Sequence, residues 1–508
     1  MGVLTNLEPQ KVFTFFEDIC GIPHGSGNIE KISDYLVEFA KKRNLEVIQD
    51  AVKNVIIIKE ATPGYEKEPV MVLQGHMDMV AVKKPDCDID MQTEGLRLAV
   101  DGDDIYAEGT SLGGDDGIAV AYALALLDSD DIKHPRLEVI ITVDEETGMD
   151  GAREIDLSML KGNRLLNLDS EDEGIFLTSC AGGARAGCEL PLVAKVENGI
   201  LVNIQISGLQ GGHSGVEIHH ERGNSNCLMG RVLWNLQKKA PIQLVSINGG
   251  LADNAIPRET KATILISTES DLCKKIMEMP TEPTVLDETL EDLMMDISDE
   301  LATKDPDFKL SWNVENQMVS MAAVSVEDTK KAASFLIALP NGVQQMSADV
   351  KGLVETSLNM GMLKLKSEGN QATNSVQNAE IMLEATFAVR SSVESAKLAL
   401  LQRLEAITTM VGGKCSVVGN YPGWVYRVDS PLREKMIKVY EQMYGKAPKV
   451  EAIHAGLECG ILGSKIKDLD CVSIGPDMKD IHTTEERLSI SSTKRVWEYV
   501  VKLLETRD

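Results

Sequence analysis

Short apolar runs alternate with helical patterns over the first 185 residues. This alternation predicts an α/β domain with a mostly parallel sheet flanked by helices. Strands are expected at 54–59, 70–75, 137–143 and 164–169, and a helix at 118–127. In such sheets, ligand-binding groups gather beyond the carboxyl ends of the strands. The polar residues that follow these runs are therefore the first candidates for chemistry.

A different pattern begins near Ala186, where longer strands alternate apolar and polar residues. Strands expected at 201–207 and 261–267 and a helix at 395–410 predict an inserted α+β domain over 186–422. The α/β pattern returns with a helix at 431–444, a strand at 471–474 and an amphipathic helix at 493–504. We therefore expect one domain split between 1–185 and 423–508, with a second domain inserted in it. The insert is long enough for two small α+β units, although its halves share no convincing repeat.

Charge and cysteine content narrow the classes of protein. The net charge of −28 and the absence of basic clusters argue against nucleic-acid binding, since phosphate contacts need such clusters. No basic segment followed by an apolar run opens the chain, and no run of about 18 apolar residues appears, so we expect neither export nor a membrane span. The nine cysteines are scattered without paired spacing, which favours reduced thiols and a cytoplasmic protein.

Polar residues of metal-binding type stand at the predicted strand ends. His76 and Asp78 follow the strand at 70–75, and residues two apart in an extended segment face the same side. A neutral imidazole is a good zinc ligand, and a carboxylate can accept its other N–H. An ordinary polar strand end is the structural alternative. Asp115 follows two glycines and precedes a helix, where it could hold a metal or merely cap that helix.

Four further candidates occupy equivalent places. Glu145 and Glu146 end the strand at 137–143, and their diverging side chains could divide the roles of base and metal ligand. Asp169 closes the strand at 164–169, and His482 follows the strand at 471–474. A solvated acid pair is the usual reading of Glu-Glu alone. With only eight histidines in the chain, however, this set predicts a divalent metal site, most simply zinc, with manganese or cobalt possible.

Taken in order, these residues resemble the ligand series of the co-catalytic zinc metallopeptidase family of carboxypeptidase G2, aminoacylase-1, succinyl-diaminopimelate desuccinylase and carnosinase. Longer matches extend the resemblance over nearly the whole chain, toward the family's bacterial dipeptidases that cleave aminoacyl-histidine. These matches are residues 20–24, 75–80, 145–152, 168–174, 211–215, 254–258, 421–424 and 454–460.

The resemblance implies a catalytic domain (1–185 and 423–508), an inserted lid domain (186–422) and two metal ions. It implies that Asp115 bridges the ions, that His76 and Asp169 complete one site, and that Glu146 and His482 complete the other.

The same resemblance assigns the remaining roles. Asp78 would orient the metal-ligating histidine, Glu145 would be the general base, and His213 would stabilise the oxyanion. Substrate-binding roles fall to Arg390, which would pair with the free carboxylate, and to Asn254; a structural salt bridge is the alternative for Arg390. Glu458 is a further candidate, for the substrate's amino group. The chain departs from the family pattern at Asp116 and at Thr483-Thr484, which puts metal affinity and the loop around His482 in doubt.

The expected function is hydrolysis of small dipeptides by metal-activated water, with aminoacyl-histidine and carnosine-like dipeptides as substrates. A related amidase or peptidase acting on N-acyl amino acids or tripeptides is the first alternative. A scaffold protein that has kept the fold is the second, although a scaffold has no need of a base beside buried acids. The protein is expected to act as a monomer or homodimer.

Overall fold

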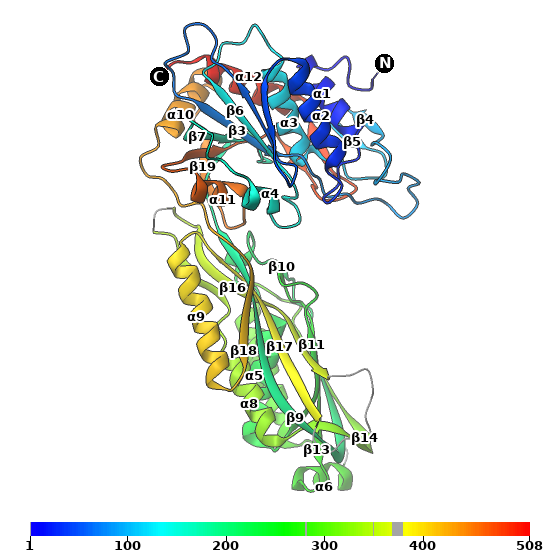
Figure 1. The fold of residues 1–508 in the computed structure, drawn as a ribbon. Helices are drawn as coiled ribbons and strands as arrows, with labels where there is room; N and C mark the ends of the chain where they lie inside the picture. The colour runs from blue at the N-terminus through cyan, green and yellow to red at the C-terminus, as the bar shows by residue number, and fades with distance from the viewer. Residues whose placement is uncertain (1, 280–281, 349, 368–378) are drawn as a thin grey trace. The chain divides into compact units, whose positions relative to one another are not determined.

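The chain forms two compact units in a computed structural model that describes residues 2–279, 282–348, 350–367 and 379–508 (Figure 1). Unit 1 comprises Met1–Cys180, Trp424–Ala452 and Leu457–Asp508, and unit 2 comprises Ala181–Gly423 and Ile453–Gly456. The sequence-based boundaries lay at 185/186 and 422/423 and did not include the return at 453–456. The physical reason is backbone pairing: Ala181 N–H donates to the carbonyls of Ile453 and Ala455, and Gly183 pairs with Arg390 in unit 2.

Unit 1 is built on an eight-stranded mixed sheet. Its order is β1 (Glu46–Gln49), β2 (Val55–Lys59), β6 (Leu137–Thr142), β3 (Met71–His76), β7 (Arg164–Asn167), β20 (Asp470–Ser473), β8 (Ile175–Cys180) and β19 (Lys449–Ile453). The four central strands, β6, β3, β7 and β20, are parallel, whereas β1, β2 and β8 pair antiparallel. The parallel part is thus confined to the centre, where the strands are almost entirely buried.

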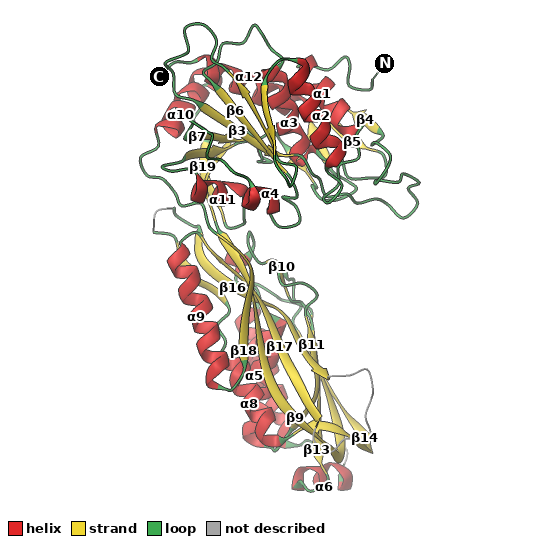
Figure 2. Ribbon diagram, in the orientation of Figure 1, coloured by secondary structure: helices red, strands yellow, loops and turns green. Residues whose placement is uncertain are grey.

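Helices flank this sheet (Figure 2). They are α1 (Gln10–Cys20), α2 (Glu30–Lys42), α3 (Gly114–Leu127), α4 (Asp150–Glu154), α10 (Pro431–Tyr444), α11 (Glu458–Lys465) and α12 (Ile490–Glu505). A smaller sheet has the order β21 (Met478–Lys479), β22 (Arg487–Ser489), β5 (Asp104–Ala107) and β4 (Leu98–Asp101). The predicted apolar stripe of α12 is confirmed, because its members are buried in the core of unit 1. Every residue of β3 is buried, and each large apolar side chain so buried contributes roughly 1.5–3 kcal/mol.

Unit 2 is an antiparallel sheet organised around one long strand, β9 (Gly182–Ser207). The first half of β9 pairs with β17 (Ala379–Ser391) and β18 (Lys414–Tyr421), and its second half pairs with β13 (Thr260–Ser267) and β14 (Lys309–Val324). The other strands are β10 (Gly212–His213), β11 (Gln243–Gly249), β12 (Ala255–Ile256), β15 (Gly342–Met346) and β16 (Val354–Ser367). Because β9 runs through both halves, they share one sheet.

The helices of unit 2 complete a common core. They are a 3-10 turn at Ile218–His220, α5 (Ser225–Lys239), α6 (Asp271–Glu278), α7 (Val285–Leu301), α8 (Val326–Ala338) and α9 (Glu394–Met410). Buried residues from α5, α6, α7, α8 and α9 join those of β9 in one cluster. Within the described residues the insert therefore folds around a single main core.

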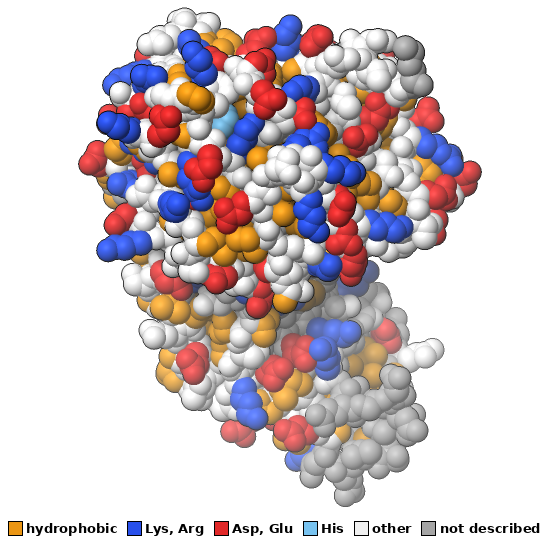
Figure 3. Space-filling model, turned by 45° about the horizontal axis from the view of Figure 1, so that its top comes forward, with side chains coloured by type: hydrophobic (Ala, Val, Ile, Leu, Met, Phe, Trp, Pro, Cys, Tyr) orange, Lys and Arg blue, Asp and Glu red, His pale blue; other side chains and the backbone are white. Residues whose placement is uncertain are grey.

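Among the described residues, no helix combines the length and apolar character that crossing a bilayer requires. All nine cysteines are free. On the face drawn in Figure 3, acidic and basic side chains are interspersed.

Candidate metal centre

The parallel strands bring the candidate ligands to one edge of the central sheet. His76 is the last residue of β3, Glu146 lies just after β6, and Asp169 lies just after β7. Since β6, β3 and β7 are parallel neighbours, their carboxyl ends meet at the same edge. Asp115 enters from the loop that opens α3, and His482 enters from the loop between β21 and β22.

Asp115 stands between the two imidazoles. Its Oδ1 lies 3.1 Å from Nε2 of His76, and its Oδ2 lies 3.1 Å from Nε2 of His482. On one side, Asp169 Oδ1 is 3.6 Å from His76 Nε2, and on the other, Glu146 Oε1 is 2.9 Å from His482 Nε2. One carboxylate with an oxygen toward each of two His–carboxylate pairs has the form of a bridging ligand.

The donors fit divalent cations. Three sets have ligand atoms within 4.8 Å of one another: His76 with Asp116 and Asp169, His76 with Glu145 and Glu146, and Asp115 with Glu146 and His482. All donors are imidazole nitrogens or carboxylate oxygens, and no cysteine joins any of these sets. Mixed imidazole and carboxylate ligation suits zinc, manganese or cobalt.

The charges at the centre favour a bound cation. Hydrogen bonds from its ring to the carboxylates of Asp115 and Glu146 raise the pKa of His482 to about 10. Burial alone would lower the pKa of His76, but the carboxyls of Asp115, Asp169 and Asp78 outweigh it and raise that pKa well above its usual value. A proton on either imidazole neutralises the converging carboxylates, and a metal ion bound between the same groups would do so too. The site therefore suits a cation.

The side chain of Asp78 makes its shortest hydrogen bonds with Ser26 and with the turn that carries Glu145, and not with the ring of His76. The ring Nδ1 of His76 lies 2.9 Å from the backbone carbonyl of Asp78, and the Asp78 carboxylate is 3.5 Å from that nitrogen. The carboxylate instead accepts from the backbone N–H of Glu145 at 3.0 Å and from the hydroxyl of Ser26 at 2.8 Å. Asp78 therefore fixes the imidazole through its main chain and the turn of Glu145 through its side chain.

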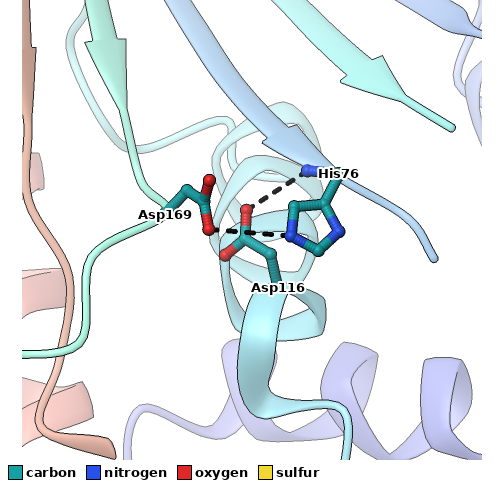
Figure 4. A group of neighbouring side chains, drawn as sticks. All are labelled: His76, Asp116 and Asp169. Atoms are coloured by element: carbon teal, nitrogen blue, oxygen red, sulfur yellow. Dashed lines mark hydrogen bonds and ion pairs between the residues drawn. The ribbon is translucent and has the colours of Figure 1, made fainter. Parts of the chain in front are cut away.

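Asp116, known from the sequence only as a departure from the family pattern, lies beside the same histidine. Figure 4 shows Asp116 and Asp169 facing His76 from the start of α3 and the end of β7. Asp116 Oδ2 accepts the backbone N–H of His76 at 3.2 Å, and its buried Oδ1 has no hydrogen-bond partner. The close approach needs Gly75, because a Cβ there would stand 2.6 Å from Asp116 Oδ2.

Glu458 does not occupy the place expected of a group that receives a substrate amine. Its side chain has no exposed surface, and its Oε2 accepts from Gln74 Nε2 and Thr142 Oγ1, each at 2.6 Å. Gln74 in turn accepts from Asn167 at 2.6 Å. Glu458 thus ties together β3, β6 and β7 beneath the metal centre, and burial raises the pKa of its carboxyl to about 8.

The remaining predicted residues lie in unit 2. His213 (β10) pairs with Ala255 (β12). The residue before Ala255 is Asn254, whose side chain is exposed. Arg390 lies near the end of β17, and no acidic side chain among the described residues pairs with it; its Nε is buried without a partner. Burial, followed by the charge of Arg390, lowers the pKa of His213 and brings that of His454 to about 3. The salt-bridge alternative for Arg390 thus has no support in the described residues.

Converging imidazoles and carboxylates at the ends of parallel strands, with further acids beside them, define a metal-dependent hydrolase. Residues 72–506 match the sequence profile of Peptidase family M20/M25/M40, and the chain belongs to this family. It is therefore a metallopeptidase, and the family resemblance drawn from its motifs is confirmed.

Named relatives cover the whole chain. It is 36% identical over 508 residues to the cytosol non-specific dipeptidase of Escherichia coli K12, covering 99% of both chains. It also resembles the crystal structure of aminoacylhistidine dipeptidase from Vibrio alginolyticus, with a TM-score of 0.85 and 34% identity over 99% of this chain and 98% of that one. The aminopeptidase PepT of Bacillus cereus ATCC 10987, at 16% identity and a TM-score of 0.58 over 98% of both chains, shares the fold.

Proposed function

We propose that this protein is a cytoplasmic di-metal dipeptidase that cleaves aminoacyl-histidine dipeptides, carnosine-like ones included. The main support is the position of Asp115, whose two carboxylate oxygens each lie 3.1 Å from a different imidazole. The substrate class is supported by the two dipeptidases that the chain resembles over its full length. The nine free thiols suit a reducing compartment.

The proposed ligands divide into two half-sites that share Asp115. His76 and Asp169 complete one, and Glu146 and His482 complete the other, with zinc as the expected metal and manganese or cobalt as alternatives. When bound, such a metal pair supplies Lewis-acid chemistry that makes water acidic and polarises a carbonyl.

Glu145 is the proposed general base. It follows β6 beside the ligand Glu146, and the carboxylate of Asp78 holds its backbone N–H. Burial raises the pKa of Glu145 well above its usual value. A carboxylate placed here takes the proton of the attacking water and returns it to the leaving amine.

His213 is the proposed oxyanion donor, and its tautomer suits that role. Its ring Nδ1 accepts from the backbone N–H groups of Gly215 at 3.3 Å and Val216 at 3.2 Å. A nitrogen that accepts two hydrogen bonds carries no proton, so the neutral ring must carry its proton on Nε2. Nε2–H is then a donor for the developing oxyanion.

Arg390 is the proposed partner of the dipeptide's free carboxylate, since its planar fork matches a carboxylate and it has no acidic partner among the described residues. Asn254 is proposed to assist in holding the substrate. Glu458 is not proposed to bind substrate, because its side chain is fully buried in unit 1.

The test compares metal-loaded wild type with Glu145→Gln on carnosine, a second dipeptide, a tripeptide and an N-acetyl amino acid. We expect the dipeptides to be cleaved fastest and Glu145→Gln to lower kcat by about 10²- to 10⁴-fold. Glu145→Gln should keep its metal, as measured by elemental analysis, because the proposed ligands are intact. Glu154→Gln, an exposed acid on α4, is the control.

Faster cleavage of the N-acetyl amino acid or tripeptide would favour the amidase or tripeptidase alternative. Wild type without stoichiometric metal would support the scaffold reading.

A further inference from the structure

The loop that presents Asp115 is held by a side chain far away in the sequence. Glu486 is 3% exposed, and its Oε2 accepts the backbone N–H groups of Leu112 at 2.7 Å and Gly113 at 3.1 Å. Its Oε1 accepts those of Gly114 at 2.8 Å and Asp115 at 3.4 Å. One carboxylate thus receives four consecutive backbone N–H groups.

These contacts decide what the Asp115 side chain is free to do. The first residues of a helix leave backbone N–H groups without helical partners, and a carboxylate nearby satisfies them and complements the helix dipole. The residue before α3, Gly113, has no side chain to provide such a cap. Because Glu486 supplies it, the carboxylate of Asp115 can turn both oxygens to the imidazoles.

Glu486 also lies on the loop that carries the second histidine. His482 is four residues away, its side chain is 44% exposed, and its φ is 62°. Asp480 has a φ of 51°. Left-handed backbone at a non-glycine residue is unfavourable, so such a loop keeps its shape only when its surroundings hold it. The buried carboxylate of Glu486 fastens this loop to the backbone of residues 112–115.

The hydroxyl of Thr483, where the family pattern is different, supports the same loop. It donates to the carbonyl of Asp480 at 2.7 Å and accepts the backbone N–H of Glu485 at 3.1 Å. The departure in sequence is therefore compensated locally, and the loop still delivers Glu486 to its buried place.

We propose that Glu486 is a positioning residue of the metal centre, one that fixes the bridging Asp115 and docks the loop of His482 against it. The inference rests on the proposed di-metal function. Loss of this carboxylate should weaken the half-site of Asp115, Glu146 and His482 more than the half-site that contains His76 and Asp169.

Glu486→Gln is the test variant, and Glu485→Gln is its matched control. An amide keeps the size of the side chain but turns an N–H₂ group toward backbone donors that need an acceptor. Glu485 is the adjacent acid, but it is exposed and pairs with Lys84 at 2.6 Å. Zn²⁺ titration by calorimetry should give two equivalents for wild type and for the control. In Glu486→Gln we expect one equivalent to be weakened by about 10- to 100-fold and the other to be weakened less.

A second measurement does not depend on metal. In the metal-free protein, hydrogen exchange should show lost protection of the amides at 112–115 in Glu486→Gln, with the sheet strands and the control unchanged. Two tight equivalents, equal weakening of both, or unchanged protection at 112–115 would each overturn the inference. Absence of metal binding by wild type would instead overturn the proposed function.

Discussion

The charge of Arg390 gives a sharp test of substrate recognition. Its guanidinium is only partly exposed, its Nε is buried without a hydrogen-bond partner, and no acidic side chain among the described residues neutralises it. A partly buried cation that has no acidic partner is suited to receive an anion. A dipeptide's carboxylate is the anion that the proposed function supplies.

The perturbation is Arg390→Met, which keeps much of the aliphatic stem and removes the charge and the N–H donors. A hydrogen bond to a charged group contributes about 1.5–3 kcal/mol, and about 1.4 kcal/mol corresponds to a tenfold change. Loss of one such bond should therefore lower kcat/KM for a free dipeptide by roughly 10- to 150-fold. Arg390→Lys should recover only part of this, since a point charge does not reproduce the planar fork.

The assay measures kcat/KM for a dipeptide and for the same dipeptide with its carboxylate converted to an amide. Wild type should prefer the free carboxylate, and Arg390→Met should lose most of that preference because the amide never used the charge. Arg403→Met, an exposed arginine on α9, is the control. If Arg390→Met slowed both substrates by the same factor, the residue would support the fold and would not recognise the carboxylate.

Two further predictions concern stability. Gly75→Ala should lower the free energy of unfolding by about 1–3 kcal/mol, because its Cβ would stand 2.6 Å from Asp116 Oδ2 and 2.7 Å from the Cβ of Ala119. In urea unfolding, Gly463→Ala is the comparison, since its Cβ would meet nothing closer than 3.8 Å, and equal stability of the two variants would contradict the prediction. Burial and the charge of Arg390 lower the pKa of His454 to about 3 in the folded protein. Between about pH 6.5 and pH 3, His454 is therefore protonated in the unfolded chain and neutral in the folded one. Acidification across this window should therefore destabilise wild type more than His454→Asn, and parallel pH dependences of their urea midpoints would disprove this.

The sequence by itself determined the secondary structure around the site. The strand and helix periodicities predicted β2, β3, β6 and α12 to within a few residues, because these segments are apolar over whole faces. The motifs predicted the family, because metal chemistry restricts which residue types can stand at the strand ends. The prediction of a mostly parallel sheet is confirmed for the four central strands. The sequence did not show that β1, β2 and β8 pair antiparallel, since the pattern of a fully buried strand is the same whether its neighbours run parallel or antiparallel.

Tertiary structure alone decided the contacts that join residues distant in the chain. From its residue type, Glu458 could be a substrate-binding group. In the fold it is fully buried, and Gln74 and Thr142 donate hydrogen bonds to one of its oxygens. In the sequence, Glu486 looks like a surface acid, as its neighbour Glu485 is. In the fold it is buried and accepts hydrogen bonds from four backbone N–H groups. Every residue except proline carries the same backbone N–H donor, so the sequence does not show which of these donors a buried carboxylate will meet. Only the folded structure identifies them.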